Sequence, residues 1–132
     1  MKKFKVVPGA LLMMVVATGV GAAPAHAVES NCFSREVCLY QQSYYSGCFY
    51  RWTGNDRDYR DNKPSKQTSL NVCNAATMND YATSIDNDGA NCGTTHFVDL
   101  GEQGRGFYLP RGDYIGALSQ TYDDELTSHR WC

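Results

Sequence analysis

Short apolar and aromatic runs, separated by Gly, Asn, Asp and Ser, dominate the chain beyond residue 27. No segment there repeats apolar residues with the period of an amphipathic helix. The chain also has nine tyrosines and twelve glycines, and Tyr favours strands whereas Gly favours turns. Many short strands between frequent turns predict an all-β sandwich or barrel, with strands expected at 37–40, 48–52, 96–100, 106–109 and 129–131.

The first 27 residues have a different pattern, which predicts a secretory signal peptide. Lys2, Lys3 and Lys5 precede an apolar stretch, and Ala25-His26-Ala27 matches the small-residue motif before a cleavage site. The apolar run is shorter than the ~20 residues that a membrane span needs. We therefore expect residues 1–27 to be removed on secretion, and residues 28–132 to form a single extracellular domain without membrane contact.

The charge of this secreted part excludes one class of partner. Residues 28–132 contain nine basic and 14 acidic side chains, which gives a net charge of −5. An acidic protein is a poor partner for nucleic-acid phosphates, so no nucleic acid is expected. The same balance suits a protein that holds cations, although solubility alone also explains it. We expect a monomer.

All six cysteines lie within residues 28–132, and an even number in a short exported chain predicts disulfides. The sequence leaves their pairing open. A zinc site is the rival interpretation, but no Cys-x-x-Cys pair is present and only His96 and His129 follow the signal peptide. Disulfides are therefore expected among Cys32, Cys38, Cys48, Cys73, Cys92 and Cys132.

The segment Thr53–Ser69 is polar and mixed in charge, and it predicts a long surface loop. Two interpretations remain open for it. It can be a tolerated insertion, because a long loop adds little closure entropy. It can also be a binding loop.

A six-residue pattern occurs twice, as NDYATS at 79–84 and as DDELTS at 123–128. Both copies read [N/D]-[N/D]-x-x-Thr-Ser, and each lies towards the end of one of two similar halves. Asn, Asp and Thr side chains, together with backbone carbonyls, supply the oxygen ligands that Ca²⁺ prefers. One hexapeptide has too few ligands, whereas two copies related by a pseudo-twofold axis can complete each other's sites. Local turn capping by the same residue types is the alternative, and it explains one copy better than two.

These features resemble the microbial βγ-crystallins. In that family each Greek-key motif has an aromatic-x4-aromatic-x-Gly hairpin, followed by a calcium-binding [N/D]-[N/D]-x-x-[S/T]-Ser arch. The sequence LYQQSYYSG matches the hairpin through Tyr40, Tyr45 and Gly47. The resemblance covers nearly all of residues 28–132 and implies a βγ-crystallin-like sandwich of two Greek-key motifs, at about 36–92 and 94–132, held together by disulfides.

The second hairpin, within THFVDLGEQGRG, departs from this pattern. If Gly106 is the hairpin glycine, Asp99 and Gly104 stand where the aromatic residues are expected. We therefore expect the aromatic packing of this hairpin to be lost and the second arch to be intact. In the first hairpin, Gln41 stands where the family often has an acidic residue, a change to which a backbone carbonyl ligand is indifferent.

The resemblance implies two Ca²⁺ ions held by the paired arches. It places ligands on the Thr83 and Thr127 hydroxyls, on the Asp80 and Asp124 side chains, on the Tyr81 and Glu125 carbonyls, and on carbonyls near Gln41 and Leu100 in the hairpin of the partner half. The other arch residues are expected to shape the arches through hydrogen bonds between side chain and backbone, namely Asn79, Ser84, Asp123 and Ser128.

The exported, Cys-rich form is also similar to secreted actinobacterial proteins of this type, which include peptidase inhibitor family I36 and killer-toxin-like proteins. The stretches VCLYQQSYYSG and TSHRWC carry this likeness. Two functions follow from it as hypotheses. The first is a secreted calcium-binding protein. The second is an inhibitor of extracellular metalloproteinases that presents a rigid loop such as Thr53–Ser69 to the protease.

An enzyme is not expected. No Ser or Cys nucleophile motif is present. The adjacent Asp123 and Asp124 point apart on an extended chain, whereas the two carboxylates of a glycosidase face each other across a bond. The tripeptide Arg111-Gly112-Asp113 is expected to turn the chain between strands, with the glycine at positive φ, rather than to serve in adhesion.

Overall fold

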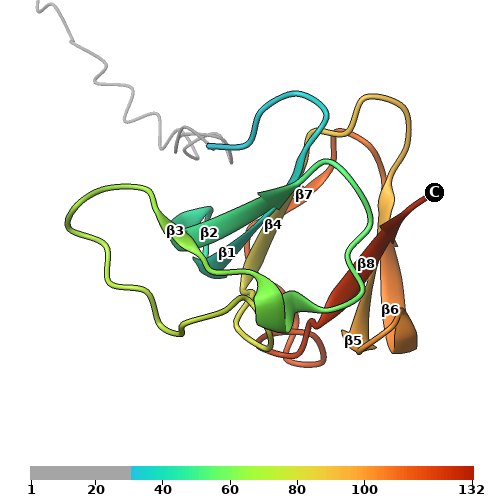
Figure 1. Ribbon diagram of the computed structural model, residues 1–132. Coiled ribbons are helices and arrows are strands. Elements are labelled where there is room, and N and C mark those ends of the chain that lie inside the picture. The colour runs from blue at the N-terminus through green and yellow to red at the C-terminus, as the bar shows by residue number, and fades with distance from the viewer. Residues whose placement is uncertain (1–30) are drawn as a thin grey trace, which may run out of the picture.

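Two antiparallel sheets pack against each other in the computed structural model, which describes residues 31–132 (Figure 1). The predicted signal peptide and its cleavage site lie outside the described residues. The five-stranded sheet has the order β3-β2-β1-β4-β7, and the three-stranded sheet has the order β6-β5-β8. The all-β sandwich prediction is confirmed by β1 (Val37–Gln42), β2 (Ser46–Trp52), β3 (Ser65–Lys66), β4 (Ser84–Asn87), β5 (Thr94–Asp99), β6 (Gln103–Leu109), β7 (Tyr114–Ile115) and β8 (Ser128–Trp131).

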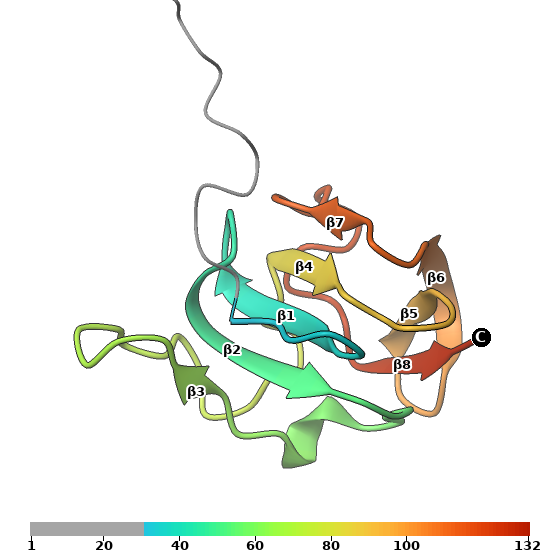
Figure 2. The same ribbon diagram turned by 90° about the horizontal axis from the view of Figure 1, so that it is seen from above.

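Each half of the chain sends a segment to the sheet of the other half. Strand β7, from the second half, pairs with β4 of the first, with Ile85 opposite Ile115 (Figure 2). In return, Asp56 forms an antiparallel bridge with His129 of β8. The two backbone hydrogen bonds of this bridge are 3.0 and 2.7 Å long. This exchange joins the two halves into one sandwich.

The prediction that Thr53–Ser69 is a surface loop holds for the many exposed residues of this segment, but it fails at the buried Tyr59 and Asn62. Residues 53–62 form a strap that crosses onto the second sheet, with a short 3-10 turn, η1 (Tyr59–Asp61). Tyr59 is fully buried, and its ring stacks on Trp52 at 4.8 Å between centroids. Because the residues around Tyr59 are polar, the sequence offered no sign that its side chain is buried in the core. Among residues 31–132, no helix is long and apolar enough to cross a membrane.

The central strand β1 is buried on both faces. Val37 and Leu39 point into the main core between the sheets, and Cys38 and Tyr40 point to the opposite face, because side chains alternate along a strand. On that outer face a second, smaller cluster forms, in which Tyr40 stacks on Phe49 at 5.6 Å. Burial on both faces explains why residues 37–41 show no exposed position.

The two hairpins are equivalent, but the motif of the second begins two residues earlier than the sequence pattern predicted. Phe97 pairs with Gly106 as Tyr40 pairs with Phe49. The glycine that adopts the left-handed backbone of Gly47 (φ 79°) is Gly104 (φ 76°). The motif is therefore Phe97-x4-Glu102-x-Gly104, and the assignment through Asp99 and Gly106 is wrong. Glycines two residues apart offered two reading frames, and backbone conformation decides between them.

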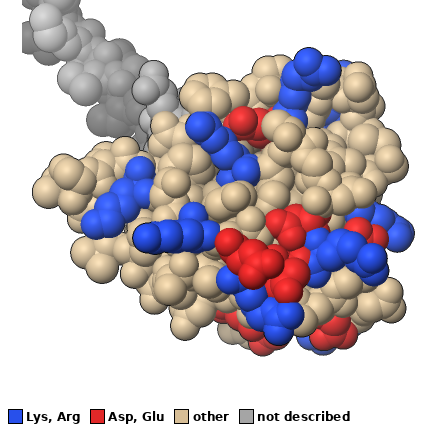
Figure 3. Space-filling view, in the orientation of Figure 1, with Lys and Arg blue, Asp and Glu red and all other residues tan. Residues whose placement is uncertain are grey.

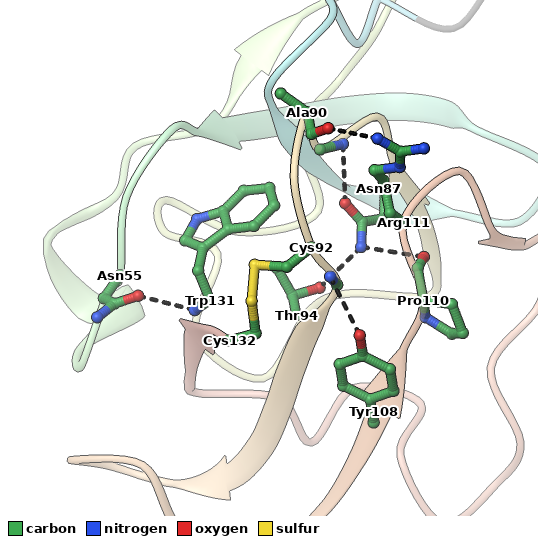
Figure 4. Close-up of a disulfide and its surroundings, with 12 residues drawn as sticks. Asn55, Asn87, Ala90, Cys92, Thr94, Tyr108, Pro110, Arg111, Trp131 and Cys132 are labelled. Carbon is green, nitrogen blue, oxygen red and sulfur yellow. Dashed lines mark hydrogen bonds between the residues drawn. A yellow bond between two sulfur atoms is a disulfide. The ribbon is translucent and has the colours of Figure 1, made fainter.

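Every cysteine is paired, which resolves the pairing that the sequence left open. The disulfides are Cys32–Cys38, Cys48–Cys73 and Cys92–Cys132. The third ties the link between the halves to the end of β8 (Figure 4). Beside it, Asn87 Nδ2 donates to the carbonyl oxygens of Leu109 and Pro110 at 3.0 and 3.2 Å.

Candidate functional site

The two hexapeptides form arches that hold each other by reciprocal backbone hydrogen bonds. The Asp80 N–H donates to the Leu126 carbonyl at 3.1 Å, and the Asp124 N–H donates to the Ala82 carbonyl at 3.1 Å. Asp80 and Asp124 also share a left-handed backbone, with φ of 58° and 56°, a conformation that Asp and Asn adopt more readily than most residues. The pseudo-twofold relation inferred from the repeat is therefore present in the backbone.

The last serine of each arch fastens the hairpin of its own half. Ser84 Oγ donates to the Gln42 carbonyl at 2.6 Å and accepts from the Tyr45 N–H at 3.0 Å. Ser128 Oγ does the same with the Asp99 carbonyl at 2.7 Å and the Glu102 N–H at 3.0 Å. Both hydroxyls are occupied by backbone partners, so these serines position the arches.

The threonine of each arch also lies beside the hairpin of its own half. The Thr83 N–H donates to the Tyr40 carbonyl at 2.8 Å, and the Thr127 N–H donates to the Phe97 carbonyl at 2.9 Å. The residue that corresponds to Gln41 in the second hairpin is therefore Val98. The hairpin carbonyls beside the arch threonines are thus those near Gln41 and Val98 of the same half, whereas the sequence led us to expect carbonyls near Gln41 and Leu100 of the partner half.

What the partner half contributes is an aspartate. The Thr83 side chain lies close enough to the Asp124 carboxylate, which comes from the other arch, to lower the pKa of that carboxyl and oppose its rise. At the equivalent place, the Asp80 carboxylate accepts a hydrogen bond from its neighbour Asn79 at 2.7 Å. The hydroxyl of Thr127 has no partner there. The arches thus bring Thr83 of one half close to Asp124 of the other half, and Asp80 and Thr127 hold the equivalent positions in the repeat.

Three buried oxygen atoms in the arches have no hydrogen-bond partner, namely Asn79 Oδ1, Asp123 Oδ1 and Thr127 Oγ1. A buried polar atom without a partner costs about 1–3 kcal/mol, and native structures contain few of them. The two hexapeptides therefore hold three buried oxygen acceptors that no protein donor satisfies.

The electrostatics of the arches also favours a cation. Burial and the nearby Glu125 raise the pKa of Asp80. Burial and the adjacent Asp123 raise the pKa of Asp124, and the Thr83 side chain opposes that rise only in part. Carboxylates held close together repel each other when ionised, so a positive ion between the arches would relieve the repulsion.

The chemistry of the donor set fits Ca²⁺ better than a transition metal. Within residues 31–132 the only cluster of three metal-binding side chains is Cys32, Glu36 and Cys38, and both of these cysteines are in a disulfide. The arches instead offer carboxylate, amide and hydroxyl oxygens, the mixture that Ca²⁺ accepts. Tyr81 and Glu125 follow the left-handed aspartates at equivalent positions, which are exposed.

The two histidines serve the core. The Tyr59 hydroxyl and His129 Nδ1 are 2.8 Å apart, as are His129 Nε2 and the Gly54 carbonyl oxygen. His96 Nε2 lies 2.8 Å from Thr94 Oγ1. Burial lowers the pKa of both rings, that of His129 to about 4. Both side chains are fully buried, so neither is placed to act on a substrate as a general base.

A second candidate site, which the sequence reading missed, is the loop of residues 67–77, called the Leu70 loop below. It projects beyond β3 at one end of the sandwich (Figure 1). Leu70 is 89% exposed and Val72 is 78% exposed. The segment 62–78 contains no acidic residue, and the same end of the space-filling view shows basic and uncharged atoms (Figure 3). The signal in the sequence was the pair of apolar residues just before Cys73.

Comparison with known proteins identifies the family and the fold. The model of peptidase inhibitor family I36 matches residues 25–109. No curated protein matches. Among solved structures, a βγ-crystallin domain connected with the evolution of the eye lens has 24% identity and a TM-score of 0.60, with 80% of this chain and 92% of that chain covered.

Two further solved structures support the same fold. A βγ-crystallin from Ciona intestinalis has 19% identity and a TM-score of 0.55, with 74% of this chain and 99% of that chain covered. Spherulin 3a from Physarum polycephalum has 24% identity and a TM-score of 0.53, with coverage of 80% and 89%. The family match spans more than half of the sequence, and the likeness to these structures extends over both sheets. The chain belongs to peptidase inhibitor family I36 and has the βγ-crystallin fold.

Proposed function

We propose that this protein is a secreted, non-catalytic protein that binds two Ca²⁺ ions through its paired arches. The observation that carries the proposal is the set of buried oxygens without a partner in the two arches, on Asn79, Asp123 and Thr127. Turn capping, the alternative explanation of the repeat, gives such oxygens a backbone partner. It accounts for Ser84 and Ser128 but leaves these three oxygens unexplained.

The first site would use the Thr83 hydroxyl and the Asp124 carboxylate, which lie close enough for Thr83 to lower the pKa of Asp124. The second would use the Thr127 hydroxyl and the Asp80 carboxylate. Further oxygens would come from the Asn79 and Asp123 side chains, whose Oδ1 atoms are buried without a partner, and from arch and hairpin carbonyls. An ion held by groups from both halves stabilises only the folded chain. Each filled site would therefore add about 2.7 kcal/mol to the free energy of unfolding when free calcium is about 100-fold above the dissociation constant.

The test is a calorimetric calcium titration of the oxidised protein, combined with melting in calcium and in chelator. We expect saturable binding of two ions and a higher melting temperature in calcium. The double variant Thr83→Ala/Thr127→Ala should lose both effects while its melting temperature in chelator falls only modestly. Thr121→Ala, an exposed threonine outside the arches, is the matched control and should behave as the wild type. A double variant that retains the full calcium shift would overturn the ligand assignment.

A second candidate function is inhibition of an extracellular peptidase. It is favoured by one observation, the match of residues 25–109 to peptidase inhibitor family I36. Three disulfides in a chain of this size also suit a protein that must resist proteolysis. The purified protein should inhibit at least one secreted metallopeptidase at fixed calcium concentration. Unchanged activity of a panel of such peptidases would remove this candidate and leave calcium binding as the function.

A further inference from the structure

The Leu70 loop places its two apolar side chains in water. Leu70 and Val72, two residues apart, are the most exposed of the large hydrophobic residues described in the structure, at 89% and 78%. Scattered single apolar residues are normal on protein surfaces. A pair at the tip of a projecting loop differs, because it contributes nothing to the core and presents apolar area to any partner.

The loop is fixed to the sandwich on both sides of this tip. On one side, Gln67 Nε2 donates to the Tyr45 carbonyl at 2.6 Å. On the other, the Cys48–Cys73 disulfide attaches the loop to β2 directly after Val72. The tip is therefore presented on a restrained backbone.

The tip also contains a turn, and hydrogen bonds to β1 hold the part of the loop that follows Cys73. The Asn71 N–H donates to the Thr68 carbonyl at 3.2 Å, and the Thr68 N–H donates to Asn71 Oδ1 at 2.8 Å. The buried Gln41 side chain accepts from the Asn74 N–H at 2.8 Å and donates to the Thr77 carbonyl at 3.3 Å. A loop restrained in this way loses little conformational entropy when it binds a partner.

From these observations we propose that the Leu70 loop is the peptidase-binding element, and that Leu70 and Val72 enter apolar subsites of a peptidase active-site cleft. The inference rests on the inhibitory function proposed above. A cleft is the partner that fits, because a narrow projecting loop fills a concave surface better than a flat one. The subsites of this cleft should be apolar, because the tip of the loop offers a leucine and a valine. The segment 62–78 around the tip has lysines but no acidic residue.

The experiment measures inhibition constants of the full oxidised protein at fixed calcium. The probes are a thermolysin-type metallopeptidase, which has an apolar primary subsite, other secreted metallopeptidases, and trypsin, whose primary subsite takes basic residues. The loop variant is Leu70→Asp/Val72→Asp. Its matched control is Leu100→Asp, which alters an exposed leucine in the second hairpin. Melting curves check that all variants fold, as expected for changes at exposed positions.

We expect the loop variant to inhibit the apolar-specific peptidase at least about tenfold more weakly than the wild type, and the control to stay within about twofold. We also expect amide exchange within residues 67–77 to slow in the complex. If the wild type inhibits and the loop variant inhibits equally well, the loop assignment is overturned while the inhibitory function stands. If the wild type inhibits none of the peptidases, the proposed inhibitory function fails and this inference fails with it.

Discussion

Asn74 of the Leu70 loop is bound twice by Gln41 of β1: its backbone N–H donates to Gln41 Oε1 at 2.8 Å, and its Nδ2 donates to the Gln41 carbonyl at 3.2 Å. Gln41 is only 2% exposed. The preceding residue, Tyr40, accepts the backbone hydrogen bond of Thr83 from the first arch. The Leu70 loop and the first arch, which have separate proposed roles, are therefore joined through two consecutive residues of β1.

Replacement of Gln41 by alanine should loosen the Leu70 loop. The variant leaves the Asn74 N–H and the Thr77 carbonyl without their partners, and such losses cost about 1–3 kcal/mol. We expect a modest fall in melting temperature and faster limited proteolysis between residues 67 and 77. Gln42→Ala, at an exposed neighbouring position, is the control. Equal proteolysis rates for the two variants would show that Gln41 does not restrain the loop.

Calcium should slow proteolysis of the same loop. The loop leads directly into the first arch through Met78, whose N–H donates to the Asn62 carbonyl at 2.9 Å. An ion that orders the arch would reduce local opening of the segment attached to it. We expect a lower cleavage rate within residues 67–77 in calcium than in chelator. Thr83→Ala should abolish the difference. A calcium effect that persists in this variant would place its origin outside the first arch.

The arch aspartates should affect the calcium-free and calcium-bound protein in opposite directions. Their raised pKa values mean that ionised Asp80 and Asp124 destabilise the fold at neutral pH, where burial and nearby acids disfavour the charge. Asp80→Asn and Asp124→Asn should therefore raise the melting temperature in chelator, and asparagine tolerates the left-handed backbone.

In calcium the same two variants should melt below the wild type, because an ionic ligand is replaced by a neutral one. Melting in both buffers checks the crossover, and Asp88→Asn, an exposed aspartate outside the arches, is the control. If both variants melt higher than the wild type in calcium as well, the carboxylates are not ligands.

The features that depend on local pattern were predictable from the sequence, and those that depend on distant partners were not. Alternation and turn residues predicted the sandwich, and the repeated hexapeptides predicted equivalent arches, because each arch is formed by six consecutive residues. The strap was missed because the burial of Tyr59 depends on His129, seventy positions away. The second hairpin was misplaced because Gly104 and Gly106 differ in φ rather than in residue type.

The buried histidines should make the protein less stable in mild acid. Both side chains have a pKa below the ordinary value of 6.5 because burial disfavours the imidazolium, and that of His129 is about 4. The unfolded chain therefore binds protons that the folded chain does not. The stability contributed by the neutral rings is complete above pH 6.5, and it falls as the pH drops from 6.5 towards 4.

The expected slope is about 1.4 kcal/mol per pH unit for each histidine in that window. The Gly54 carbonyl oxygen, 2.8 Å from His129 Nε2, favours the protonated ring and opposes the effect of burial on the pKa only in part. Denaturant unfolding between pH 7 and pH 4.5, in chelator, measures the slope. The raised pKa values of Asp80 and Asp124 give a contribution of opposite sign, because these groups take up protons in the folded chain as the pH falls. His96→Gln and His129→Gln should each lower the absolute stability. Each should also reduce the slope by the contribution of one histidine, about 1.4 kcal/mol per pH unit. An unchanged slope in both variants would show that the histidines do not cause the acid sensitivity.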